Sequence, residues 1–362
     1  MVDVIVVGGG LLGMLTAREL QQRGATVMIL ERGQAGGESS WAGGGILSPL
    51  YPWRYNDAVN RLARVGHQFY PHIAQSLHDE SGVDPEYICS GMLVLDQHEN
   101  SAAQNWTQAW NIKLEILEEK ALQVQQAGLG QQIKSALWLP EIAQLRNPRL
   151  IKSAIGSLKH RKIACLENTE VTGFEINKGA IRGVTTHQAV YHADKVVIAG
   201  GAWTANIIKD FATPPEIQPV KGQMILFKGE PGLLKTMVLS QGRYLIPRRD
   251  GRILAGSTLE YSAFDKSITD TALADLRATA ITLLPVLTDL PIEHHWAGLR
   301  PGSQQGVPYI CAHPEINGLY INSGHYRNGV ILGAGSAQLM TDLICGATPT
   351  IDPSFYDFDA QH

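Results

Sequence analysis

Apolar residues form short β-branched runs at the start of the chain, in its middle and near its end. The run Val4–Val7 shows no alternation of apolar and polar positions, which is typical of a parallel strand covered on both faces. Apolar residues then recur at roughly helical spacing from Leu12 to Leu20, Gly24 follows, and residues 25–30 form a second apolar run. This pattern predicts a strand, a helix and a second buried strand.

Three glycines lie at the turn between the first predicted strand and its helix. Gly8, Gly10 and Gly13 have the G-x-G-x-x-G spacing, and the second strand ends at Glu31. Glycines permit a tight turn and close approach to a pyrophosphate, while the helix start offers unpaired N–H groups. Glu31 can accept from ribose hydroxyls, which favours a free 2′-hydroxyl over the phosphate of NADP. The unit predicts dinucleotide binding but does not separate NAD from FAD, and a glycine-rich turn without nucleotide is the alternative.

Two later segments predict further strands of the same sheet. Residues 194–204 form a buried strand that runs into Gly200-Gly201, and residues 318–344 form a strand, a polar glycine loop and a helix that begins near Gly329. A sheet assembled from such distant pieces requires another unit to be inserted between them.

The inserted region is expected to be largely antiparallel. Residues 220–229, 244–258 and 292–299 predict strands, the second of which contains a hairpin turn at Asp250-Gly251. Residues 267–287 predict a helix with a threonine or aspartate cap.

Composition narrows the function classes. Of 362 residues, 44% are hydrophobic and 18% are charged, as in an ordinary folded protein. A net charge of -4 gives no basic field for phosphate backbones, so we expect no nucleic-acid partner. There is neither a basic leader nor a run of about eighteen apolar residues, so we expect no signal peptide, no stable membrane association and a cytoplasmic location. The four cysteines form no C-x-x-C pair and are expected to be reduced.

The segment that follows Glu31 favours FAD over NAD. Ser39 and Ser40 can donate hydroxyls to phosphate, and Gly43–Gly45 lets the backbone approach a flat ring system. A flexible loop is the alternative. The helix from Gly329 would point its positive end at the pyrimidine edge of a flavin and stabilise the anionic reduced ring. We therefore predict an α/β fold: a Rossmann-type FAD-binding domain (1–85, 145–215 and 296–362) with an inserted α+β substrate-binding domain (86–144 and 216–295) built on a mixed, largely antiparallel sheet.

The motifs together resemble the FAD-dependent D-amino-acid oxidase superfamily and, within it, the glycine oxidases of the thiamine pathway. The matching segments are "VVGGGLLG", "LER", "SSWAGGGIL", "VVIAGGAWT", "PVKGQM", "RYLIPRRDGRILAGSTLE", "WAGLRPGSQQGVPYI" and "GHYRNGVIL". Besides the motif glycines, the resemblance implies non-covalent FAD contacts at Leu11, Leu12, Glu31, Arg32, Ser39, Ser40, Gly43, Gly44, Gly45, Ile46, Val171, His325, Tyr326, Arg327, Asn328, Gly329, Val330 and Ile331.

The same resemblance implies three substrate contacts. Arg300 would bind the carboxylate of an amino acid through two charge-assisted hydrogen bonds, and the phenol of Tyr244 would contact the same carboxylate. The Arg327 segment would offer a backbone carbonyl to the amine. From the residues alone, an ion pair between Arg300 and Glu293 and a purely structural Tyr244 are the alternatives.

The activity implied by the resemblance is oxidation of glycine, and of sarcosine and small D-amino acids, by hydride transfer to flavin N5 with O2 as acceptor. The products would be glyoxylate, ammonia and H2O2, within thiazole biosynthesis for thiamine, and the enzyme would be a homotetramer. The alternatives are a D-amino-acid dehydrogenase that passes electrons to a quinone and an RNA-modifying flavin oxidase module.

Three further features have competing interpretations. His294 and His295 are consecutive in a predicted strand and face opposite sides, so we expect no metal site. Cys311 lies where sarcosine-type relatives attach flavin, but its context follows the glycine oxidase pattern. Trp53 and Arg54 could form a lid near the pocket or a surface turn.

Overall fold

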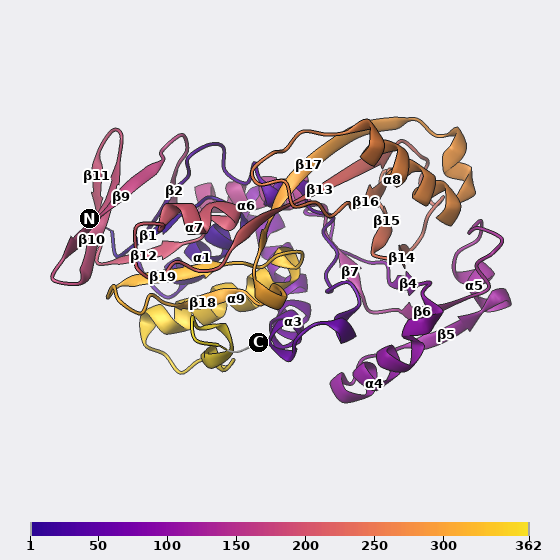
Figure 1. The fold of residues 1–362 in the computed structure, drawn as a ribbon, viewed down its shortest axis with the longest axis horizontal. Coiled ribbons are helices and arrows are strands. Elements are labelled where there is room, and N and C mark those ends of the chain that lie inside the picture. Colours follow the sequence, from indigo (N-terminus) through magenta and orange to yellow (C-terminus); the bar gives the residue numbers. More distant parts are fainter. Residues whose placement is uncertain (1, 361–362) are drawn as a thin grey trace.

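A computed structural model describes residues 2–360 and contains two large sheets that lie side by side along the long axis of the molecule (Figure 1). One sheet is mostly parallel and occupies the left half of the view. Its strands, in spatial order, are β18 (Tyr309–Ala312), β19 (Leu319–Ser323), β12 (Lys195–Ile198), β1 (Val4–Val7), β2 (Val27–Leu30) and β8 (Ala164–Leu166). Only the β18–β19 pair is antiparallel. The predicted strands 4–7, 25–30, 194–204 and 318–323 thus do share one sheet.

Both faces of the parallel sheet are covered. Val4 and Val6 pack into one core cluster with residues of α1 (Leu11–Gln22), α3 (Asp57–Ser81), α6 (Asn147–His160) and α9 (Gly329–Cys345). Ile5 and Val7 pack on the other face with residues of β9 (Val171–Asn177) and β10 (Ala180–Thr186), which form a small antiparallel sheet with β11 (Val190–His192). A strand buried on both faces needs apolar residues at every position, which explains the unbroken run at residues 4–7.

The second sheet has eight strands and occupies the right half of Figure 1. Its order is β17 (Ile292–Gly302), β13 (Gln218–Phe227), β16 (Ile253–Gly256), β15 (Arg243–Pro247), β14 (Met237–Ser240), β4 (Met92–Val94), β6 (Ser135–Leu139) and β5 (Glu115–Glu118). All neighbours are antiparallel except β14 and β4. The predicted fold class is confirmed.

Alternation along these strands separates two faces. Ile225 and Leu245 pack with α8 (Asp270–Leu283), whereas Met224, Tyr244 and Ile246 belong to a different cluster on the opposite face. The side chain of Thr269 caps α8 by accepting from the N–H of Ala272, as the sequence predicts. The face that carries Tyr244 is therefore the one available to a ligand.

The remaining elements are short. They are α2 (Ser39–Ala42), α4 (Asn100–Trp110), α5 (Glu119–Gln125), α7 (Thr204–Ile207) and the two-stranded sheet of β3 (Ile88–Cys89) and β7 (Ala143–Gln144). The predicted domain boundary at residues 295/296 falls inside β17, so the strand that carries Arg300 belongs to the eight-stranded sheet. The division into two domains otherwise remains a prediction.

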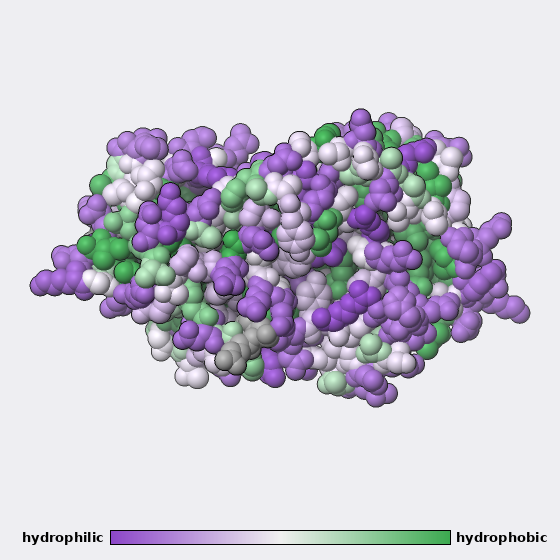
Figure 2. Space-filling model, viewed as in Figure 1, coloured by the Kyte–Doolittle hydropathy of each residue, from purple (hydrophilic) through white to green (hydrophobic). Residues whose placement is uncertain are grey.

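The surface view shows hydrophilic and hydrophobic side chains interspersed over one face, without a continuous apolar band (Figure 2). Within residues 2–360, every helix is too short or too polar to cross a membrane. All four cysteines are free, and Cys311 is buried in the β18–β19 pair.

Candidate active site

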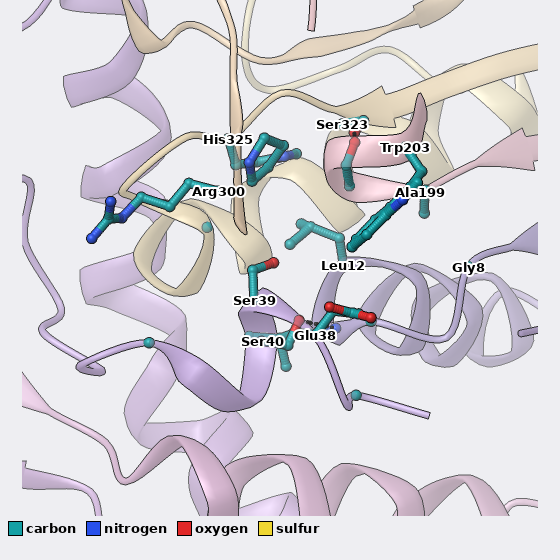
Figure 3. A pocket seen from close by; sticks show the side chains of 18 of the residues that line it. Gly8, Leu12, Glu38, Ser39, Ser40, Ala199, Trp203, Arg300, Ser323 and His325 are labelled. Carbon is teal, nitrogen blue, oxygen red and sulfur yellow. Dashed lines mark hydrogen bonds between the residues drawn. The ribbon is translucent and has the colours of Figure 1, made fainter. Parts of the chain in front are cut away.

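A cavity of about 590 Å³ lies between the two sheets. Its lining includes the residues that directly follow β1, β2 and β12, and the end of β19. Ligands of open parallel sheets bind at these carboxyl ends. Figure 3 shows Arg300 on one side of the cavity and Ala199 and Trp203 on the other, with Glu38, Ser39 and Ser40 between them. The cavity is thus long enough to connect a nucleotide cleft to an arginine.

The glycine turn after β1 allows close packing of the helix and the strand. A Cβ on Gly13 would lie 2.0 Å from the carbonyl oxygen of Gly8, and Gly8 has φ +113°. Gly10 is the N-cap of α1 and makes no side-chain capping bond, while the hydroxyl of Ser40 accepts from the N–H of Leu11 at 2.9 Å. The first turn of α1 therefore faces the cavity through backbone and one hydroxyl, which suits a phosphate.

Glu31 is held rigidly at the end of β2. Its Oε2 accepts from the N–H of Gly9 at 2.7 Å, and its Oε1 accepts from the N–H of Gly33 at 2.8 Å. Each carboxylate oxygen retains a second lone pair. A ribose hydroxyl can therefore still donate to Glu31, as the sequence motif predicts.

The Gly43–Gly45 segment is clamped between the eight-stranded sheet and the start of α6. A Cβ on Gly44 would lie 2.9 Å from Cδ1 of Ile246, and one on Gly45 would lie 2.0 Å from the carbonyl oxygen of Leu145. Asn147 closes the segment from behind by donating to the carbonyl oxygen of Ser40 at 2.7 Å. Side chains are excluded here, so the backbone itself forms this wall of the cavity.

The loop before α9 brings a neutral histidine to the cavity. His325 is 1% exposed, and burial lowers its pKa to about 3. Its Nε2 lies 2.8 Å from the hydroxyl of Ser336, and that hydroxyl donates to the carbonyl oxygen of Leu332. Ser336 therefore accepts from His325, so Nε2 carries the proton and Nδ1 is an acceptor. His325 cannot supply positive charge to a reduced flavin; the start of α9 at Gly329 can.

Arg300 is a buried cation without an acidic partner. Its Nη2 donates to the hydroxyl of Ser257 at 2.7 Å, and its Nη1 donates to the carbonyl oxygens of Lys221 and Thr258 at 3.3 Å. No carboxylate lies within 4.0 Å of its nitrogens among residues 2–360. Burial lowers the pKa of the guanidinium, and the charge of Arg327 acts in the same direction. The alternative pairing with Glu293 is excluded, because Glu293 binds Arg252 at 2.6 Å.

Space for this guanidinium depends on Gly222 of β13. A Cβ at that position would lie 2.0 Å from Nη2 and 2.3 Å from Cζ of Arg300. Tyr244, which also lines the cavity, is 7% exposed, and its hydroxyl has Met224 Sδ as its hydrogen-bond partner at 3.6 Å. A sulfur is a weak acceptor, so the phenol remains available to a stronger one.

Gly222→Ala is expected to displace Arg300 without altering its charge. Because the methyl group would overlap the guanidinium, we expect kcat/KM for a carboxylate-bearing substrate to fall by about 10²-fold. Steady-state kinetics with glycine, and the inhibition constant of acetate as a carboxylate probe, measure the effect. Unchanged values for both would show that Arg300 does not bind the carboxylate.

Most of the predicted site residues meet in this one cavity. Those that line it are Gly8, Gly10, Leu11, Leu12, Glu31, Arg32, Ser39, Ser40, Gly43, Gly44, Gly45, Ile46, Val171, Tyr244, Arg300, His325, Tyr326, Arg327, Gly329 and Val330. Gly13, Asn328 and Ile331 do not line it. Gly13 packs against Gly8, Asn328 is the buried N-cap of α9, and Ile331 is fully buried beside Gly66.

The structure also places residues at the cavity that the sequence did not single out. They include Glu38, Asn147, Trp203, Met224 and Ser257. Trp203 stacks on Phe264 with ring centroids 5.4 Å apart, and Glu38 pairs with Lys266 at 3.0 Å. The loop between β16 and α8 thereby contacts two residues that line the cavity. An Asn-Pro pair at a helix start could have drawn attention to Asn147. Trp203, Met224 and Ser257 lie in segments that carry the family resemblance, whereas Glu38 had no local signal.

Two features with competing interpretations lie away from the cavity wall. Trp53 and Arg54 both contact the carboxylate of Glu99, and Arg54 also covers the ring of Tyr51. Their neighbours Ser48 and Leu50 do line the cavity. Cys311 is not among the lining residues and packs in the core on the far face of the parallel sheet.

A cleft at the carboxyl ends of a parallel sheet, entered by a glycine turn and a ribose-binding acid, is the arrangement of a dinucleotide-binding enzyme. Comparison with known proteins identifies the family. The family model for FAD dependent oxidoreductases (DAO) matches residues 3–343. The chain belongs to this FAD-dependent family.

Its relatives include glycine oxidases. The chain is 46% identical to the glycine oxidase of Pseudomonas aeruginosa, over 98% of this chain and 97% of that protein. The crystal structure of glycine oxidase from Bacillus cereus superposes with a TM-score of 0.90 at 32% identity, covering 96% of this chain and 95% of that one. The bifunctional protein ThiO/ThiG of Trichormus variabilis is 29% identical over 94% of this chain and 52% of its own length.

The residues present fit FAD. The Gly8–Gly13 turn and Ser40 suit a pyrophosphate, Glu31 suits a ribose, and the side-chain-free wall at Gly43–Gly45 suits a flat ring. The cavity volume of about 590 Å³ lies within the usual range for ligand and cofactor sites, roughly 300–1,000 Å³.

Proposed function

We propose that the protein oxidises glycine, with O2 and water, to glyoxylate, ammonia and H2O2. The observation that carries this proposal is the buried Arg300 guanidinium, which faces the cavity beside Tyr244 without any acidic partner in the described part of the chain. Isolated buried charges are costly, and because this one lines the cavity, an anionic ligand explains it best. A carboxylate accepts both prongs of the guanidinium fork.

The other residues of the chamber orient the substrate. Tyr244 is placed to donate to the carboxylate, and the backbone at Arg327 is proposed to accept from the amine. This loop is fixed to the strand that carries Arg300, since the N–H of Tyr326 donates to the carbonyl oxygen of Pro301 at 2.9 Å. Binding the substrate at both its carboxylate and its amine presents the α-carbon to the flavin site at the Gly43–Gly45 wall. Orientation therefore supplies much of the catalysis. FAD, when bound, supplies the two-electron acceptor for the α-carbon and passes the electrons to O2.

The protonation states fit this role. The side chains of Arg300 and Arg327 are guanidinium groups, which carry a permanent positive charge, and His325 is neutral with its Nε2 proton engaged by Ser336. Two fixed positive charges disfavour an ammonium group beside them. The amine is therefore expected to react in its neutral form, without a side-chain base to remove the C–H proton.

The test is oxidation of glycine by the FAD-loaded protein. We expect O2 consumption and equal molar yields of H2O2 and glyoxylate, with sarcosine and small D-amino acids also accepted. A flavin that glycine reduces under anaerobic conditions but that O2 does not reoxidise would favour the quinone-linked dehydrogenase instead. A FAD-loaded protein that none of these substrates reduces would refute the proposal.

Two wider features belong to the same proposal. Similarity to a ThiO/ThiG protein supports a place in thiazole formation for thiamine, where the glycine-derived imine would be used. Homotetramer formation is proposed from the family resemblance alone, and the cytoplasmic location stays the expectation drawn from the sequence. Light scattering of the purified holoenzyme tests the tetramer.

A further inference from the structure

We propose that Arg248 is a positioning residue, which holds the cofactor wall at Gly44 and the substrate strand at Tyr244 in one register. The inference rests on the proposed function. Arg248 directly follows β15, four residues after Tyr244. Its Nη2 donates to the carbonyl oxygen of Gly44 at 2.8 Å, and its Nη1 donates to Gln144 Oε1 at 2.9 Å and to the carbonyl oxygen of Leu145 at 3.1 Å. One guanidinium thereby joins three segments that are distant in the sequence.

This cation is buried and has only neutral partners. Arg248 is 9% exposed, and no carboxylate forms an ion pair with it within residues 2–360. Burial lowers its pKa to about 10, so it stays charged at neutral pH. An apolar side chain would fill the space without the desolvation cost of a charge. The hydrogen bonds of Arg248 are therefore better explained by the backbone carbonyl groups that they hold in place than by a gain in folding stability.

The carbonyl that Arg248 holds belongs to the Gly43–Gly45 wall of the cavity, where side chains have no room. At Gly44, a Cβ would lie 2.9 Å from Ile246 and 3.3 Å from the ring of Tyr244. The next residue, Gly45, accepts at its carbonyl oxygen from the N–H of Leu145 at 2.8 Å. A small shift of the Gly43–Gly45 segment would therefore press Gly44 against the ring of Tyr244. Arg248 resists this shift, because it directly follows the strand that carries Tyr244 and binds the carbonyl oxygen of Gly44.

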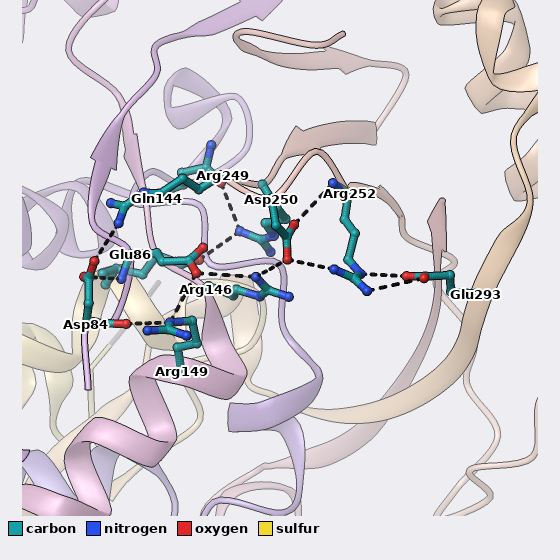
Figure 4. Close-up of polar contacts among 11 residues, drawn as sticks. Asp84, Glu86, Gln144, Arg146, Arg149, Arg249, Asp250, Arg252 and Glu293 are labelled. Atoms are coloured by element: carbon teal, nitrogen blue, oxygen red, sulfur yellow. Dashed lines mark hydrogen bonds and ion pairs between the residues drawn. The ribbon is translucent and has the colours of Figure 1, made fainter. Parts of the chain in front are cut away.

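The turn that carries Arg248 is also fixed from outside. Figure 4 shows Asp250 between Arg146 and Arg252, and Arg252 in turn bound to Glu293. Arg249 forms a separate pair with Asp84 at 2.6 Å, and its side chain is 55% exposed. Exposed pairs of this kind contribute little individually. Arg249 is therefore a matched control, because it adjoins Arg248 in the same turn and carries the same charge.

Arg248 also places a buried positive charge, which has no ion-pair partner among residues 2–360, behind the Gly43–Gly45 wall. A buried charge acts through a low dielectric and is screened little by salt. It therefore favours the form of the cofactor that carries more negative charge, which is the reduced form. This effect separates Arg248 from a residue that only supports the fold, because structural support alone does not shift a redox potential in a fixed direction.

The experiment compares Arg248→Met, Arg248→Lys and Arg249→Met as FAD-loaded enzymes. For Arg248→Met we expect kcat with glycine to fall by about 10²-fold, a smaller change in KM, and a more negative flavin midpoint potential. Arg248→Lys, which keeps the charge but not the fork, should retain the wild-type potential with an intermediate kcat. Arg249→Met should match the wild type in all three measurements.

Two further results keep the inference falsifiable. If Arg248→Met does not fold, Arg248→Ala is loaded with FAD in millimolar guanidinium, and kcat and the potential should recover with guanidinium concentration. Wild-type kcat and potential in Arg248→Met, or an unchanged potential in unrescued Arg248→Ala, would overturn the proposal. The potential needs no substrate, so failure of glycine oxidation in the wild type would refute the proposed function and still leave this inference testable.

Discussion

Arg300→Met is expected to lower kcat/KM for glycine by about 10²- to 10⁴-fold. The substitution removes two hydrogen bonds to a charged group, each contributing about 1.5–3 kcal/mol, and every 1.4 kcal/mol corresponds to about tenfold. The loss of kcat/KM reaches the high end of this range if Tyr244 cannot hold the carboxylate alone. In the described residues, the hydroxyl of Tyr244 bonds to the sulfur of Met224, which is a weak acceptor. Stopped-flow reduction of the flavin by glycine measures binding and chemistry separately.

Two comparisons make this result specific. Arg300→Lys keeps the charge as a point donor, so it should be less impaired than Arg300→Met but should not restore wild-type kinetics. Arg277→Met removes an arginine from α8 whose side chain, within residues 2–360, bonds only to the carbonyl oxygen of Thr288, and it should leave glycine oxidation unchanged. FAD absorbance should be retained in all three variants. A wild-type kcat/KM in Arg300→Met would remove the main support for an amino-acid oxidase.

The parallel sheet could be predicted because its sequence signals are local. The run Val4–Val7, the spacing of the glycines and the strand after Gly318 are each decided within a few residues, and all three match the structure. The hairpin at Asp250-Gly251 is also local: β15 and β16 pair across it, and Gly251 has φ +88°. At these positions the strand propensities and the turn residues favour the same structure as the tertiary packing, so a prediction from local sequence holds.

The walls of the cavity were less predictable, because they are formed by contacts between distant residues. Arg248 meets Gly44 across about two hundred positions, and Phe264 meets Trp203 only because two sheets are juxtaposed. Neither contact leaves a local pattern. Asn328 and Ile331 differ in another way: they lie in a motif that does reach the cavity, but their side chains are buried at the start of α9 and do not line it, so their contacts with FAD stay a prediction.

Arg300 shows how far residue type alone can reach. The sequence shows a permanently charged arginine among apolar neighbours. From the residues alone, this arginine could bind a substrate or form an internal ion pair with Glu293. The structure closes the second possibility, since Arg252 occupies that carboxylate. It also reveals why β13 has a glycine at position 222, where the guanidinium lies. The charge of Arg300 is evident from the sequence, but the space that Gly222 leaves for its guanidinium could not be predicted.

Glu80→Gln is expected to lower the free energy of unfolding by about 3–5 kcal/mol near neutral pH, because it leaves the buried Arg18 and the partly buried Arg161 without their anion. Glu80, in α3, binds Arg161 through Oε1 at 2.5 Å and Oε2 at 2.9 Å, and Arg18 of α1 at 3.1 Å. Ser157 of α6 and Ser76 also donate to it. One carboxylate thus ties together three helices that cover the parallel sheet. Glu19→Gln breaks an exposed pair with Arg23 and should cost less than about 1 kcal/mol.

The effect of Glu80 should depend on pH in a defined direction. Although burial raises its pKa, the donors from Arg161, Ser157, Arg18 and Ser76 outweigh burial and lower it from 4.5 to about 2. A carboxyl whose folded pKa is depressed stabilises the fold above its unfolded value and loses that contribution as the pH falls through the folded value. The difference between the wild type and Glu80→Gln in urea unfolding should therefore be full above about pH 5 and shrink towards about pH 2. A difference that stays constant over this interval would show that Glu80 acts through packing, because glutamine has the shape of the protonated acid but cannot follow its titration.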